Sequence, residues 1–315
     1  MARSDLIGAI DIGSNSIKLS VGRLDERGDL VERSWPPETV RLGAGLEETG
    51  RLASDRMDAA VAAVKRFVGL AHEAGADRVV AVATEATRAA ANGPEFLARL
   101  RRETGIEARP IDGDEEARLT FRGLAATADL RSAALVADVG GGSTELIAAR
   151  DGAPTGWRSL PLGSGRLTDR LVRADPPTAA ELAACEDAAA STLGERVRDV
   201  RAAADGPLRL IVVGGTGEYL RQLVEREPAD RADVARVLTN LTRIAARDLA
   251  DRLSIAESRA RVLPAGIAIV AALAAAADAA RIDMARSGVR LGLLLELLRP
   301  DETTPPPRDE RDADG

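Results

Sequence analysis

The chain has 315 residues, of which 45% are hydrophobic and 30% charged, and its formal net charge is −7. This length is comfortable for two hydrophobic cores, and the acidic balance makes the chain a poor non-specific binder of nucleic acid. A single cysteine, Cys185, and a single histidine, His72, exclude a disulfide framework and zinc sites of the His/Cys type. We therefore expect a protein of a reducing compartment, the cytoplasm.

The first third of the chain predicts a hairpin followed by alternating helices and strands. Apolar runs and alternating patterns predict strands at 6–12, 17–24, 29–42, 79–84 and 106–111. Helical spacing from Ser54 to Ala74 predicts a helix that Ser54 caps and Gly75 ends. Further helices are expected from Pro94 and from about Asp114, and the segment from Thr84 to Arg88 is expected to be a loop.

The pattern then restarts with a second hairpin. Strands are expected at 134–139, 145–150, 157–162, 208–213 and 282–286. Helices are expected at 179–204, 218–226, 238–252, 257–261, 264–280 and 289–298. The apolar segment 265–281 reads as a buried helix and not as a membrane span, so we expect no membrane association.

Two glycine-rich segments repeat at a constant offset of 127 residues. AIDIGSNSIKLSVGR, residues 9–23, aligns with VADVGGGSTELIAAR, residues 136–150. Asp11 matches Asp138, while Lys18 and Glu145 occupy equivalent places. The repeat predicts an α/β protein of two similar domains, residues 1–126 and 127–300, with a ligand cleft between them. The proline-rich, polar tail at 301–315 is expected to be disordered.

An acid, glycines and hydroxyls in this order suit phosphate. Glycines allow backbone N–H groups to converge on an anion, hydroxyls add donors, and an acid at the end of a buried strand can share Mg²⁺ with the phosphate. The predicted phosphate-binding residues are Gly13, Ser14, Asn15, Ser16, Gly140, Gly141, Gly142, Ser143 and Thr144. The predicted metal ligands are Asp11, Asp138 and Glu145, with Mn²⁺ as a substitute for Mg²⁺. Neither segment is a P-loop or a dinucleotide fingerprint, because the GK[ST] ending is missing and a strand follows the glycines.

A third loop, a candidate base and several arginines complete the set. Gly214, Gly215 and Thr216 follow a predicted strand and precede a helix, whose positive end can receive a phosphate. With His72 set aside, water activation falls to a carboxylate, and Glu115 and Glu116 are candidates, although acids favour helix starts for other reasons too. The candidate phosphate clamps are Arg88, Arg118, Arg122, Arg166 and Arg290.

Taken together, these motifs resemble the Ppx/GppA phosphatase family of exopolyphosphatases and guanosine pentaphosphate phosphohydrolases. Further segments that carry the resemblance are LGAGLEETGRL (42–52), ATEATRAAAN (83–92), DGDEEARLTFRG (112–123), LPLGSGRLTDR (160–170), VVGGTGEYL (212–220) and RVLPAGIAIV (261–270). The resemblance implies two actin-like, ribonuclease H-like domains and Mg²⁺-dependent release of terminal phosphate from inorganic polyphosphate or pppGpp. It also implies that Glu116 is the general base, that Asp11, Asp138 and Glu145 surround the metal, and that Arg88 contacts the phosphates.

Two departures from the family pattern bear on substrate choice. Leu291 stands between Arg290 and Gly292, and Gly217-Glu218-Tyr219 follows the third loop where small residues are usual. The chain also lacks the C-terminal helical domain of longer members, so we expect action on short chains. We further expect a homodimer. Two alternatives stay open: an actin-like sugar or acid kinase, and a non-catalytic regulator that binds polyphosphate or (p)ppGpp.

Overall fold

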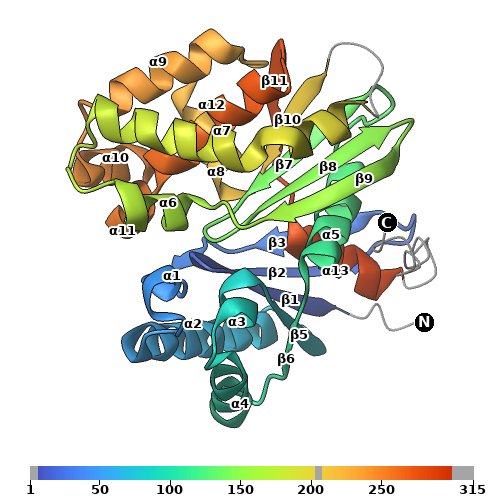
Figure 1. Ribbon diagram of the computed structural model, residues 1–315. Coiled ribbons are helices and arrows are strands. Elements are labelled where there is room, and N and C mark those ends of the chain that lie inside the picture. Colours follow the sequence, from blue (N-terminus) through green and yellow to red (C-terminus); the bar gives the residue numbers. More distant parts are fainter. Residues whose placement is uncertain (1–5, 203–207, 300–315) are drawn as a thin grey trace, which may run out of the picture.

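The protein folds around two mixed β-sheets of matching topology, as a computed structural model describes for residues 6–202 and 208–299 (Figure 1). In the first sheet the order is β3-β2-β1-β5-β6, and in the second it is β9-β8-β7-β10-β11. In each sheet the first three strands of the chain pair antiparallel, and the last two add parallel strands on the other side. The first sheet has one more short strand, β4, which pairs antiparallel with β2. The same five-strand plan therefore occurs twice, which confirms the expected α/β fold with two units of the same plan.

We call the unit built on the first sheet the first lobe and the unit built on the second sheet the second lobe. The strands of the first sheet are β1 Ile7–Ile12, β2 Ser16–Leu24, β3 Leu30–Ser34, β4 Glu38–Thr39, β5 Arg78–Ala83 and β6 Ala108–Pro110. The strands of the second are β7 Ala134–Val139, β8 Thr144–Arg150, β9 Ala153–Leu160, β10 Arg209–Val213 and β11 Arg281–Met284.

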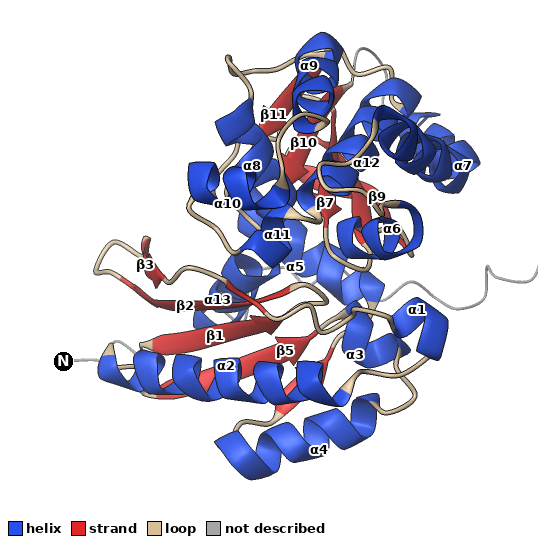
Figure 2. Ribbon diagram, turned by 90° about the vertical axis from the view of Figure 1, so that its left-hand side faces the viewer, coloured by secondary structure: helices blue, strands red, loops and turns tan. Residues whose placement is uncertain are grey.

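The helices cover the outer faces of both sheets and fill the space between them (Figures 1 and 2). The first five helices of the chain are α1 Leu46–Thr49, α2 Ser54–Glu73, α3 Glu85–Ala89, α4 Gly93–Thr104 and α5 Gly113–Ala125. The later helices are α6 Ser164–Leu171, α7 Ala179–Ala202, α8 Gly214–Leu223, α9 Arg231–Leu241, α10 Ala246–Leu253, α11 Glu257–Ala260, α12 Leu263–Ala276 and α13 Val289–Leu298. Helices α5 and α13 pack against each other, with α13 also on β1 and β2 and α5 on β8 and β9.

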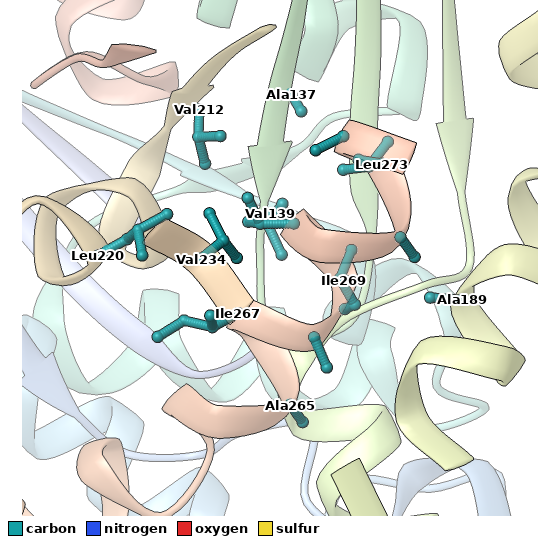
Figure 3. Packing of buried hydrophobic residues seen from close by; sticks show 14 of the residues in the cluster. Ala137, Val139, Ala189, Val212, Leu220, Val234, Ala265, Ile267, Ile269 and Leu273 are labelled. Carbon is teal, nitrogen blue, oxygen red and sulfur yellow. The ribbon is translucent and has the colours of Figure 1, made fainter. Parts of the chain in front are cut away.

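The core of the second lobe is built from aliphatic side chains around α12. Ile267, Ile269 and Leu273 of this helix lie close to Val139 and Val212 at the ends of β7 and β10 (Figure 3). The helical stretch Glu257–Ala276 passes the length and hydropathy test for a membrane span, but 78% of its most apolar window is buried inside the protein. The expected buried helix is thus present. Such burial explains how a chain with 2% aromatic residues still fills its core.

Several expected elements differ in the structure. The strand expected at 29–42 is divided into β3 and β4 by Trp35-Pro36-Pro37, since proline has no N–H for the ladder. The expected loop from Thr84 to Arg88 contains the short helix α3. The single helix expected at 238–252 is the two helices α9 and α10, and α6 was not expected at all.

The ends of two helices also differ from the expectation. Ser54 does not cap α2, because Ala53 occupies the N-cap position and no side chain bonds there. The third glycine loop is the first turn of α8 and not a linker before it. The tail at 301–315 lies outside the described residues.

Candidate active site between the two lobes

The two glycine-rich segments form the same turn. The amide of Gly13 donates to the carbonyl of Ser16 at 3.2 Å, and the amide of Gly140 donates to that of Ser143 at 3.0 Å. The preceding acids are also placed alike, because Asp11 pairs in register with Lys18 and Asp138 with Glu145. The offset of 127 in the sequence is therefore a true structural repeat, and each acid stands at the end of the central strand of its sheet.

In the first loop the carbonyl groups are held by the segment that follows β4. The carbonyl of Asn15 accepts from the amides of Val40 and Arg41 at 3.1 and 2.8 Å, and that of Ser14 accepts from Gly43 at 2.8 Å. Since carbonyl oxygens would repel phosphate, fixing them in other hydrogen bonds leaves the donors of the loop for an anion.

In the second loop the start of α6 has the same role. The carbonyl of Gly140 accepts from the amide of Ser164, and the carbonyl of Gly141 accepts from that of Gly165, both at 2.9 Å. Within the described residues, the amides of Ser14, Asn15, Gly141 and Gly142 donate to no backbone carbonyl. Neighbouring amides without backbone acceptors are the donors from which anion-binding nests are built.

The two loops meet between the lobes. A Cβ placed on Gly141 would lie 2.7 Å from the Cβ of Asn15, and one placed on Gly142 would lie 1.9 Å from Oε2 of Glu85. Glycine is therefore required at both positions by close packing between the lobes. The predicted juxtaposition of the two loops is present.

A cavity of about 520 Å³ extends from the contact between the loops. Its walls carry the acids Asp11, Glu116, Asp138 and Glu145 together with Gly214 and Gly215 of the third loop. Lys18, Arg259, Arg286 and Arg290 also line it. The cavity thus brings together residues from both repeats, the start of α5 and the start of α8.

Glu116 has the buried environment that is expected of a general base. The residue is 7% exposed, and its Oε2 has no hydrogen-bond partner. Desolvation raises the pKa of Glu116 well above its usual value, and the charges of Glu145, Asp11 and Asp138 raise it further, while Arg88 lowers it. A carboxylate with a raised pKa is a better base for water than an ordinary surface glutamate.

Glu145 and Asp138 are partners across β7 and β8. Burial, and then the charge of Asp138, raise the pKa of Glu145 to about 8, while hydrogen bonds from Ser159 and Ser143 offset part of the effect. The hydroxyl of Ser159 donates to Oε1 of Glu145 at 2.8 Å. Desolvation also raises the pKa of Asp138, and the ammonium of Lys18 opposes that shift.

Asp11 completes the acidic group from the first lobe. Its side chain is buried, Lys18 Nζ lies 3.5 Å from Oδ2, and Oδ1 has no hydrogen-bond partner. Buried carboxylates that raise one another's pKa values are stabilised by a cation, and an all-oxygen donor set suits Mg²⁺. Among the described residues, however, no group of three or more acidic, histidine or cysteine side chains is close enough to form a complete metal site.

Two predicted catalytic residues do not line the cavity. Glu115, next to the cavity acid Glu116, forms an ion pair with Arg109 at 2.6 Å and a longer one with Arg118 at 3.6 Å. Arg88 donates from its guanidinium to the carbonyl of Ile111, so its effect on Glu116 is electrostatic in this structure. The structure therefore separates the two adjacent glutamates into different environments.

The threonines of the loops have structural hydrogen bonds. The hydroxyl of Thr144 donates to the carbonyl of Leu162 at 2.5 Å, and that of Thr216 donates to Val139 at 2.8 Å. Gly214 has a φ of 71°, and a Cβ there would lie 2.2 Å from Oδ1 of Asp138. The third loop thus needs glycine to approach the acid, while both threonines fix the loops in place.

Arg259 and Tyr219 were not singled out as site residues from the sequence. The guanidinium of Arg259 is buried and lies 5.4 Å from the centre of the Tyr219 ring, and both residues line the cavity. A cation over an aromatic face is a stable arrangement. Arg259 comes from the short helix α11, where no spacing or motif of the sequence marks it. Tyr219 was visible only as a departure from a family pattern.

Fold and site together define a two-lobed phosphate-processing protein, with paired anion-binding loops and a buried carboxylate between them. Its family follows from comparison: the model of the Ppx/GppA phosphatase family matches residues 36–300, and the chain belongs to that family. A relative named exopolyphosphatase 1, from Mycobacterium tuberculosis, is 29% identical over 303 residues, which cover 93% of this chain and 88% of the relative.

Solved structures agree with this assignment. The Aquifex aeolicus member of the Ppx/GppA family is 26% identical, with a TM-score of 0.71 over 95% of this chain and 99% of that one. An exopolyphosphatase from Cytophaga hutchinsonii has a TM-score of 0.83 at 24% identity, over 93% of this chain and 97% of that one. This second likeness supports the fold.

Proposed function

We propose that this protein is an exopolyphosphatase, which removes the terminal phosphate from inorganic polyphosphate by attack of water. The main support is the meeting of two anion-binding loops beside the buried, unpartnered carboxylate of Glu116. Family membership and the exopolyphosphatase relatives support the same reaction class. The pppGpp end carries the same phosphoanhydride, so hydrolysis of pppGpp to ppGpp is the second reaction that the site suits.

Binding is assigned to the two loops. The amides of Ser14 and Asn15 and those of Gly141 and Gly142 face the phosphates from opposite lobes, and Lys18 and Arg259 add positive charge along the cavity wall. A terminal phosphate is small compared with a cavity of about 520 Å³, so several phosphates of a short chain fit within it. We therefore expect short polyphosphates to be good substrates.

Chemistry is assigned to Glu116. As the carboxylate it accepts a proton from the attacking water, which displaces the shortened chain in line with the bridging oxygen. The burial that raises its pKa makes it a stronger base, and the negative charges of the neighbouring acids raise that pKa further. The positive charge of Arg88 lowers the pKa of Glu116 and so favours the charged carboxylate.

A divalent cation, Mg²⁺ or Mn²⁺, fits the acids of the cavity. Asp11 and Asp138 would hold it, with Glu145 beside them, and the unpartnered Oδ1 of Asp11 is a free ligand atom. When bound, such an ion neutralises phosphate charge. The raised pKa values of Asp138 and Glu145 are the physical sign that this cluster is short of positive charge.

The decisive experiment measures phosphate release from tripolyphosphate, long-chain polyphosphate and pppGpp. Glu116→Gln should lower kcat by about a thousandfold, because the amide cannot accept the proton. Glu115→Gln is the matched control, since the neighbouring glutamate is held in ion pairs outside the cavity and its loss should change kcat less than about threefold. Equal rates for Glu116→Gln and wild type would exclude Glu116 as the base.

The same assay separates the alternatives. A sugar or acid kinase would transfer phosphate from ATP to a small acceptor and release none to water. A non-catalytic regulator would bind polyphosphate or (p)ppGpp tightly without releasing phosphate.

A further inference from the structure

Glu85 connects the two phosphate loops from a position outside the catalytic cavity. Its side chain is 10% exposed, and its Oε2 accepts from the hydroxyl of Ser14 in the first loop at 3.1 Å. The same hydroxyl accepts from the amide of Ala86 at 3.1 Å, so Ser14 is fixed from two sides. Oε2 of Glu85 also lies so close to Gly142 of the second loop that no side chain fits between them.

Arg166 completes the connection from the second lobe. Its Nη2 lies 2.7 Å from Oε1 of Glu85, while its Nε donates to the carbonyl of Gly142 at 3.2 Å. Its backbone amide donates to the carbonyl of Gly141 at 3.1 Å. A continuous chain of hydrogen bonds therefore runs from Ser14 through Glu85 and Arg166 to the second loop.

This pair does not touch the substrate cavity. Glu85 and Arg166 line a separate cavity of about 300 Å³, and neither lines the catalytic one, whereas Ser14, Asn15, Gly141 and Gly142 line both. The loops thus form a wall between the two cavities, and the ion pair supports that wall from behind. Any effect of the pair on hydrolysis must act through the position of the loops.

We propose that the Glu85–Arg166 pair is a strut that holds the two phosphate loops at binding distance before the substrate arrives. This inference rests on the proposed function of the loops. The pair is largely removed from water, so it is weakly screened and its geometry is restricted by the bonds to Ser14 and Gly142. When the two loops are already held together in the free protein, none of the free energy of substrate binding is used to bring them together.

The strut predicts a specific kinetic signature. Without it the lobes rest further apart, and part of the free energy of substrate binding is used to bring the loops together. For Glu85→Gln and for Arg166→Gln we expect KM for tripolyphosphate to rise about tenfold, with kcat changed less than about threefold. The double variant should lose little more affinity than the worse of the two single variants, because both changes remove the Glu85–Arg166 contact.

A binding measurement makes the test independent of hydrolysis. Titration calorimetry with methylene diphosphonate, whose P–C–P bridge is not a phosphoanhydride, should show affinity about tenfold lower for each variant than for wild type. The matched control is Arg170→Gln, on the same helix α6 as Arg166. It removes an exposed 3.8 Å pair with Glu47 of α1 and should leave KM and affinity unchanged.

Three outcomes would overturn the strut. The first is unchanged KM and affinity in both single variants. The second is a fall in kcat with KM unchanged, which would describe a role in chemistry. The third is additive losses in the double variant, about a hundredfold in total, which would mean that the two residues act separately. If one single variant does not fold, KM, kcat and affinity of the other single variant still decide between the first two outcomes and the strut. Failure of the proposed function would appear instead as unchanged hydrolysis in Glu116→Gln.

Discussion

Replacement of Glu145 by glutamine tests the electrostatics of the acidic cluster. Glu145 is 1% exposed, and its pKa is raised from 4.5 to about 8. Between these values the folded protein keeps a proton that the unfolded chain has released, so the stability of the wild type falls as the pH rises through this window. At about 1.4 kcal/mol per pKa unit, this shift corresponds to a loss of at most about 5 kcal/mol by pH 8.

Glutamine has no charge to bury and can still accept the hydrogen bond from Ser159. Glu145→Gln should therefore match the wild type in stability near pH 4.5 and become more stable than it as the pH approaches 8, while phosphate release falls by at least about a hundredfold. Urea unfolding followed by circular dichroism at pH 5, 6, 7 and 8 measures the difference. A stability difference between variant and wild type that stays constant across this range would refute the reasoning.

Two further predictions concern the cation and the loops. Chelation of divalent cations with EDTA should abolish phosphate release. Added Mg²⁺ should raise the stability of the wild type at pH 8 more than that of Glu145→Gln, as measured by thermal melts with and without Mg²⁺. Equal stabilisation of both proteins would contradict a metal role for this cluster. Gly141→Ala should lower kcat/KM for tripolyphosphate by about tenfold to a hundredfold, because the added methyl would lie 2.7 Å from the Cβ of Asn15 and force the loops apart. Gly69→Ala, in α2 with no atom within 4 Å of the added methyl, is its control, and wild-type kinetics in both variants would show that the loop contact is not needed.

The two loops could be predicted from the sequence because the residues that define each loop are close together in the chain. An acid at a strand end, glycines, hydroxyls and a returning strand follow one another within a dozen residues, and the repeat at an offset of 127 supplies a second example. Strand pairing at equal offset then places Asp11 and Asp138 alike. Local sequence was enough here because turn geometry depends on neighbours in the chain.

Other features depended on packing. The residue pattern by itself could not separate Glu115 from Glu116, since both lie in the first turn of α5, and only the family resemblance singled out Glu116. Consecutive helical residues differ by about 100° in direction, so only the placement of α5 between the sheets decides which of the two is buried in the cavity. Arg88 was predicted as a clamp from its motif, but its contact with the carbonyl of Ile111 joins α3 to the segment that follows β6, 23 residues further along the chain.

The sequence by itself determined the α/β class, the duplication, the two anion-binding turns and the acids beside them, because each of these depends on patterns among residues that are close together in the chain. Only the tertiary structure decided that Asn15 would pack on Gly141, that Glu85 would reach Arg166 across the lobes, and that Arg259 would enter the cavity wall. Glu85 and Arg166 are 81 positions apart in the chain, and Asn15 and Gly141 are 126 apart (141 − 15). Burial of apolar surface, not local propensity, brings such distant segments together.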